Sequence, residues 1–464
     1  MSMEAASQLE RFLLKKQAEG SSQGESTFTI SRREAVRKLG QSSFPFEGAW
    51  MLKLIQSGVA FGAGGAIRVQ LKSLETLVSF DPGPLDLDTL ESEFYDPRGK
   101  ETRALDHLFS ALWNLAISLK RPFKISLENQ VDCLIWDGEE LYRVPDDEPG
   151  SGLSLTIRYK APSDSSSFAA RAMEAARTNI SLQSVLETYC YTCSVPLILD
   201  GRRLDTLLHC PTHGVTRESA PLALGFPPSL MPELALPPGT FENLEKGSSW
   251  SLGALADRSG LRSYAHELGA GLKPSRSAGL AYILSSHWWV NHLHSTSFRP
   301  ESRRKEHPTI YWVQDGVVVQ KERIWNGSSH CSLAIFVNAE GLRTDLTTIR
   351  LARTEERDRR RLAAVRAVRE HLEQSQDMEL AIARMTKNSR RSSTALGILS
   401  LTVGVVASAS VLPLSVVSVA AGAMNAYKSK ALVEDLKENF RKEIASLKRM
   451  LRSAENPGLE VPQW

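Results

Sequence analysis

The chain has 464 residues, of which 42% are hydrophobic and 23% are charged. These fractions are typical of globular proteins, and the length predicts two or three domains. A chain of this length can bury a hydrophobic core of its own, so the class of very short proteins that need metals or disulfides to fold is excluded. The net charge of +3 is too small to indicate a nucleic-acid partner.

Helices and strands alternate in the first third of the chain. After an N-terminal arm over residues 1–25, apolar residues recur every three or four positions from Trp50 to Val59, which predicts a helix with one buried face. A second apolar stripe predicts a helix over Leu105–Ile117. Strands are predicted at residues 67–71, 77–80, 123–127, 132–136, 140–144 and 153–159, followed by a helix at 168–189 and a hairpin at 194–208. This order predicts an α+β sandwich over residues 26–215, with helices on one face of a mixed sheet.

A second α+β unit is predicted over residues 250–352. A Pro-rich stretch within residues 216–249 is expected to be the linker that separates the two units. Strands are predicted at 278–284 and 332–337, and Asp315-Gly316 is a typical hairpin turn between two further strands.

The C-terminal quarter of the chain differs in character. A charged helix over 353–391 is followed by residues 392–427, which carry no charge and are rich in Gly, Ala, Ser and Thr. This run exceeds the roughly 20 residues that cross a bilayer, and basic residues flank both of its ends. We expect a membrane-inserted hairpin bent at Pro413; the alternative is a helical hairpin packed inside the protein or against a second protomer. Residues 428–464 are predicted to contain an amphipathic helix.

Several short motifs resemble the GHKL superfamily of ATP-binding domains, which includes the ninety-kilodalton heat-shock chaperones, MutL, type II topoisomerases and histidine kinases. Trp50-Met-Leu-Lys-Leu-Ile-Gln-Ser57 is similar to the first pocket helix of that superfamily, and Asp81-Pro-Gly83 is similar to its Asp-x-Gly turn. A bacterial group of chaperone-like proteins is also similar at residues 194–202, 314–317 and 340–346. The resemblance implies that 26–215 is a GHKL-type nucleotide-pocket domain and 250–352 a transducer-like domain.

The resemblance also implies site residues, and two of them depart from the family pattern. Asp81, with Gly83 beside it, would accept a hydrogen bond from the adenine amino group; the alternative is an ordinary turn aspartate. The catalytic carboxylate and the asparagine that helps to hold Mg²⁺ fall on Lys53 and Ser57. A lysine cannot act as a carboxylate base, although it can pair with a phosphate. We therefore expect these four residues to bind ATP or ADP without hydrolysis, and leave a role for Mg²⁺ open.

The cysteines offer a second candidate site. Cys190-x₂-Cys193 and Cys210-x₂-His213 have the spacing of a structural zinc site, and the alternative is that Cys190 and Cys193 belong to the core. The first eight residues lack the basic start and apolar core of a secretion signal, so we expect reduced cysteines and a cytoplasmic protein.

Three functions remain open from the sequence. The leading hypothesis is a chaperone-like pseudo-ATPase, a sensor or scaffold that controls a membrane-associating segment at 392–427; related chaperones suggest a homodimer. The first alternative is an active ATPase that uses another carboxylate, such as Glu47 or Asp86. The second alternative is an interaction protein that kept the fold and binds no nucleotide.

Overall fold

The computed structural model describes most of two α+β units and a pair of C-terminal helices. The described residues are 44–46, 48–62, 64–72, 75–96, 102–128, 130–146, 152–158, 168–205, 220–225, 227, 231–240, 280–286, 288–289, 301–302, 307–325, 331–345, 349–374, 438 and 441–455. The predicted N-terminal arm and the uncharged segment 392–427 lie outside them.

The first unit, described within residues 44–205, is built on one mixed sheet. Its strand order is β5-β4-β3-β6-β2-β1-β7-β8, and every pair is antiparallel except β1 with β7. The strands are β1 (Ile67–Leu71), β2 (Glu75–Phe80), β3 (Phe123–Leu127), β4 (Asp132–Trp136), β5 (Leu141–Pro145), β6 (Leu153–Arg158), β7 (Leu197–Leu199) and β8 (Arg202–Arg203). The predicted mixed α+β architecture is confirmed, although the hairpin around Asp200-Gly201 returns through only two strand residues.

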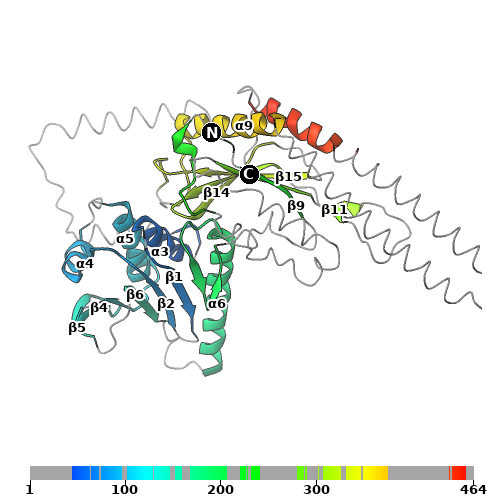
Figure 1. Cartoon of the computed structure of the whole chain (residues 1–464). Helices are drawn as coiled ribbons and strands as arrows, with labels where there is room; N and C mark the ends of the chain where they lie inside the picture. The colour runs from blue at the N-terminus through cyan, green and yellow to red at the C-terminus, as the bar shows by residue number, and fades with distance from the viewer. Residues whose placement is uncertain are drawn as a thin grey trace, which may run out of the picture.

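Helices cover the face of this sheet that is turned toward the second unit (Figure 1). They are α3 (Ala49–Ala60), α4 (Leu87–Phe94) and α5 (Arg103–Trp113), which continues as a π-helical turn over Asn114–Ser118; α6 (Phe168–Tyr189) follows later in the chain. The absence of a side chain at Gly58 lets α3 approach the sheet, because a Cβ there would lie 2.8 Å from Ile67 Cδ1 and 3.2 Å from the Phe80 ring. Helix α4 was not predicted, although Leu87, Leu90 and Phe94 have helical spacing and are buried.

The second unit has its own sheet, with strand order β14-β13-β15-β10-β9. Its strands are β9 (Ala220–Gly225), β10 (Ala281–Ser286), β13 (Thr309–Gln314), β14 (Val317–Arg323) and β15 (Cys331–Asn338), and a separate short pair is β11 (Trp288–Trp289) with β12 (Glu301–Ser302). The four strands predicted by the sequence are present, as β10, β13, β14 and β15. The Pro-rich stretch expected to be a linker instead begins with β9, which pairs with β10 at the edge of the sheet. Proline is tolerated in an edge strand, where no neighbour needs its missing N–H, so Pro221 can lie within β9.

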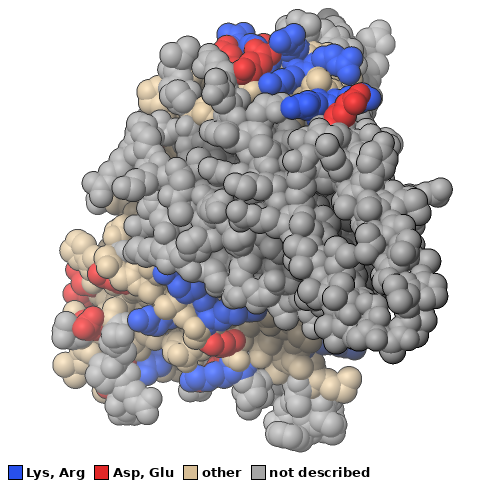
Figure 2. All heavy atoms as spheres, turned by 45° about the vertical axis from the view of Figure 1, so that its right-hand side comes forward, with Lys and Arg blue, Asp and Glu red and all other residues tan. Residues whose placement is uncertain are grey.

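Helix α9 (Glu355–Gln374) crosses the second sheet and pairs with a C-terminal helix over residues 441–454 (Figure 1). Ala364, Val368 and Leu372 of α9 are buried, as are Leu447 and Leu451 of the C-terminal helix, and all belong to one core. Figure 2 shows acidic and basic side chains interspersed over the top of the molecule, where these helices lie.

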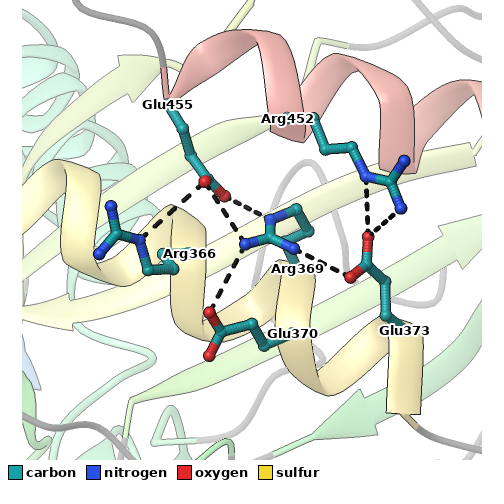
Figure 3. Close-up of polar contacts among 6 residues, drawn as sticks. All are labelled: Arg366, Arg369, Glu370, Glu373, Arg452 and Glu455. Atoms are coloured by element: carbon teal, nitrogen blue, oxygen red, sulfur yellow. Dashed lines mark hydrogen bonds and ion pairs between the residues drawn. The ribbon is translucent and has the colours of Figure 1, made fainter.

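Ion pairs between α9 and the C-terminal helix show how the two helices run relative to each other (Figure 3). Arg369 Nε lies 2.5 Å from Glu455 Oε1, and Arg452 Nη2 lies 2.7 Å from Glu373 Oε1. Residue numbers rise along one helix as they fall along the other, so the helices are antiparallel. The chain therefore leaves α9 and returns to the C-terminal helix at the same end of the pair.

No helix within the described parts of the chain is long and apolar enough to cross a membrane.

Candidate functional site

The two units meet where the turn between β13 and β14 contacts α3 and α5. The turn is Asp315-Gly316, the sequence signal for a tight hairpin, and Gln314 precedes it as the last residue of β13. Asp315 and Gly316 both have positive φ angles, of 47° and 76°. Glycine adopts this conformation without cost and aspartate tolerates it better than most residues, which explains the pair at this position.

A chain of polar side chains connects the units through this turn. His107 Nε2 donates to Asp315 Oδ2 at 3.0 Å, which leaves the lone pair of His107 Nδ1 facing Lys53 Nζ at 3.3 Å. Arg103 Nη2 lies 2.9 Å from Asp315 Oδ1, and Arg103 Nη1 also pairs with Glu340. Lys53, on α3, is 2% exposed, and the side chains of His107 and Asp315 are 7% and 5% exposed. We call Lys53, Arg103, His107 and Asp315 the interface cluster.

Burial changes the proton affinity of two members of the interface cluster. Desolvation lowers the pKa of Lys53 to about 8, although the carboxylates of Asp315 and Asp106 oppose that shift. Desolvation also lowers the pKa of His107, against the hydrogen bond to Asp315, and the nearby Lys53 charge lowers it further. A neutral His107 is consistent with its contacts, because its Nδ1 must accept while its Nε2 donates.

Side chains of the first unit also donate hydrogen bonds to backbone carbonyl oxygens at the turn. Gln56 Nε2 donates to the carbonyl oxygen of Gln314 at 3.1 Å, and Thr192 Oγ1 donates to that of Gly316 at 3.0 Å. A Cβ at Gly316 would lie 2.9 Å from Cys193 Cα, so the turn sits directly against the first unit. Hydrogen bonds, charge and close packing therefore all act on the same three residues.

Two of the predicted nucleotide-binding residues point into the protein. Ser57 is fully buried and donates to the carbonyl oxygen of Ala104 at 2.8 Å, and Lys53 belongs to the interface cluster. The other two lie on an exposed turn after β2, where Asp81 Oδ1 accepts from the Gly83 N–H at 2.9 Å. The Phe80 ring approaches Gly58, so this turn begins beside the C-terminal half of α3.

The sequence did not identify Arg103, His107 and Asp315 as site residues. Arg103 and His107 are four positions apart, so they share one face of α5. That spacing was visible, but nothing in the sequence indicated that the Asp315 turn would lie against this face.

Glu47 and Asp86 were the carboxylates considered for an active ATPase, and Asp86 lies outside the interface cluster. Asp86 is the N-cap of α4 and accepts from the Thr89 N–H at 2.6 Å. The hydrogen bonds from Thr89 lower the pKa of Asp86, which makes it a weaker base. Glu47 lies outside the described residues.

Half of the predicted zinc site can be placed. Cys190 and Cys193 are free thiols at 0% and 2% exposure, and burial raises the pKa of Cys190 well above its usual value and that of Cys193 to about 12. Buried, protonated thiols agree with the alternative interpretation, in which Cys190 and Cys193 belong to the core. Cys210 and His213 lie outside the described residues, and the described side chains contain no group of three metal ligands. The zinc site stays a prediction.

The lowered pKa of His107 makes stability depend on pH. The unfolded chain binds more protons at this group than the folded protein, so stability is complete above the ordinary pKa of 6.5 and is lost as pH falls below it. We expect urea unfolding to show a decreasing free energy of unfolding from pH 7 to pH 5, with a smaller slope in His107→Gln. Equal slopes in the two proteins would contradict the buried, neutral assignment of His107.

The chain was compared with known proteins. No protein-family model matches the sequence, and no curated protein matches it either. Among solved structures, it is similar to the crystal structure of the N-terminal domain of a DNA repair protein, at 9% identity and a TM-score of 0.35, over 74% of this chain and 99% of that chain. At this similarity the comparison does not assign the chain to a family.

Proposed function

We propose that this chain is a non-hydrolysing scaffold of the GHKL type, in which α3 couples a nucleotide-pocket-like unit to a transducer-like unit. The observation that carries the proposal is the position of Lys53. The residue that replaces the family's catalytic carboxylate is buried and bonded through His107 to Asp315 of the second unit. A group held in this way joins the two units, and at 2% exposure it is shielded from the water that a catalytic base would activate.

The surroundings of Ser57 support the same proposal. Its hydroxyl is fully buried and donates to a backbone carbonyl of α5, so the position that would help to hold Mg²⁺ is used for helix packing. Asp81 and Gly83 are exposed, which leaves that turn accessible to a ligand such as ATP or ADP.

Nucleotide titrations of the full chain test this proposal. We expect ATP and ADP to raise the melting temperature, because a ligand that binds only the folded state stabilises it, while hydrolysis stays at the background rate. Asp81→Asn should reduce that shift, and Asp200→Asn, which changes a turn aspartate on the opposite side of β1, should not. Turnover above background that Asp81→Asn removes would establish the active ATPase instead. No shift with any nucleotide would favour the interaction protein that binds none.

Membrane association through residues 392–427 is a second proposal, favoured by the antiparallel helix pair. Both ends of the connecting chain lie at the same end of that pair, as they would for a segment that enters and leaves a bilayer on one side. The full chain is expected to float with phosphatidylglycerol-containing vesicles, and a variant lacking 392–427 is expected to stay at the bottom of the gradient. Equal distribution of the two proteins would contradict this proposal and favour a packed hairpin or a homodimer, which sedimentation velocity distinguishes.

A further inference from the structure

His107 lies between a cation of the first unit and an anion of the second. Its Nε2 donates to Asp315 Oδ2 at 3.0 Å, and its Nδ1 accepts from Lys53 Nζ at 3.3 Å. Because Nε2 already carries the proton that it donates, a second proton on the ring must be placed on Nδ1, directly opposite the lysine. The His107 side chain is 7% exposed, so little water is available to screen the added charge.

A proton on Nδ1 converts the acceptor of this hydrogen bond into a donor. The contact then joins two donors, and two positive charges face each other at the 3.3 Å separation of Nδ1 and Nζ. Transfer of the lysine proton to the ring does not add a charge, because the pair still holds one positive charge. The docked arrangement opposes the second positive charge, whichever residue holds the first.

The charged groups around the pair come from both units. Those described are Lys53 on α3, Arg103 and Asp106 on α5, Asp315 in the turn, and Glu340, which pairs with Arg103. Burial opposes the protonated ring most strongly, Asp315 favours it, and Lys53 and Arg103 oppose it, so the pKa of His107 lies below its usual value. In contact with water the ring regains its ordinary proton affinity, so protons favour a state in which His107 is uncovered.

We propose that protonation of His107 releases the Asp315-Gly316 turn from the first unit, so that mild acid loosens the contact between the units. Release removes the groups with which the second unit covers the histidine ring. The inference rests on the coupling through Lys53 in the proposed function and names what controls that coupling. It requires neither a bound nucleotide nor a membrane.

The thiol of Cys193 reports on the release, because the turn lies directly against it. A Cβ at Gly316 would lie 2.9 Å from Cys193 Cα and 3.2 Å from its Sγ, and this cysteine is 2% exposed. Cys133 is 1% exposed but lies on β4, which is separated from β7 by four other strands in the sheet order. Release of the turn exposes Cys193 and leaves Cys133 buried, whereas unfolding of the first unit exposes both.

Labelling of the full wild-type chain with a pyridyl disulfide reagent, which stays reactive toward thiols in mild acid, measures this exposure. Peptide mass spectrometry assigns the labelled cysteine, and the rate in urea divided by the native rate at the same pH gives its protection. Protection of Cys193 should fall by about tenfold between about pH 7.5 and pH 5.5, as for uptake of one proton at the ordinary pKa of 6.5, while that of Cys133 stays constant. Constant protection of Cys193, or an equal fall at both cysteines, would overturn the proposal.

His107→Gln tests whether this histidine is the responsible group. Glutamine can donate to Asp315 but takes up no proton in this range, so protection of Cys193 should become independent of pH. His371→Gln is the matched control, because His371 lies on α9 outside the interface cluster, and it should keep the wild-type response. An unchanged acid response in His107→Gln would overturn the inference.

If His107→Gln does not fold, the wild-type comparison of Cys193 with Cys133 still decides whether acid releases the turn. None of these measurements uses a nucleotide. A negative result therefore overturns the acid response alone and leaves the nucleotide-binding proposal to its own titrations.

Discussion

Replacing Glu322 with alanine should lower the free energy of unfolding by about 3–5 kcal/mol. Glu322, on β14, receives Arg357 Nη2 at 2.7 Å and Trp312 Nε1 at 3.0 Å, and forms an ion pair with Arg361 at 3.0 Å. Arg357 is 4% exposed, so the substitution leaves a cation with no carboxylate inside the contact between α9 and the second sheet. A buried charge that loses its partner costs far more than the pair contributes when intact.

Glu356→Ala is the control for this expectation. Glu356 also pairs with arginines of α9, at 2.6 Å to Arg359 and 2.8 Å to Arg360, but its side chain is 36% exposed. Water can replace the lost partner, so we expect a free energy of unfolding close to that of the wild type. Both values come from urea unfolding followed by circular dichroism. Similar losses in the two variants would show that α9 does not depend on the buried contact.

Gly316→Ala should destabilise the protein by about 2–4 kcal/mol, for two separable reasons. The positive φ of 76° is unfavourable for alanine, and the new Cβ would lie 2.9 Å from Cys193 Cα and 3.1 Å from Val59 Cγ2. The backbone of the Cys193 loop has little room to move, because Thr192 is hydrogen-bonded to Gly316 itself.

Gly201→Ala separates the two reasons. Gly201 has a similar φ of 81°, but open space surrounds its Cβ position, so only the conformational cost of about 1–2 kcal/mol applies. The difference between the two variants in thermal or urea unfolding measures how closely the turn packs against the first unit. A difference near zero would mean that the turn is not held there.

The comparison of sequence with structure is clearest at α3. Its apolar spacing predicted one buried face, yet every residue from Ala49 to Gly58 is buried. The sheet covers the apolar face, while α5 and the Asp315 turn cover the rest, including Lys53, Gln56 and Ser57. Periodicity detects the face that meets a sheet, but a polar face covered by a second unit has the same pattern as one in water. For this reason the sequence placed Lys53 on the helix but did not show that a second unit would bury its side chain.

The sequence by itself determined the α+β class, nearly all the strands of both sheets and the hairpin that carries Asp315, because alternation, apolar stripes and Asp-Gly turns are local signals. That Lys53 and Ser57 stand at the catalytic positions of the GHKL superfamily stays an expectation from the resemblance. Only the tertiary structure decided that β9 belongs to a sheet, that the C-terminal helix pairs with α9, and that Asp315 reaches His107 and Arg103. Those contacts join residues far apart in the chain, and packing between units rather than local propensity selects them.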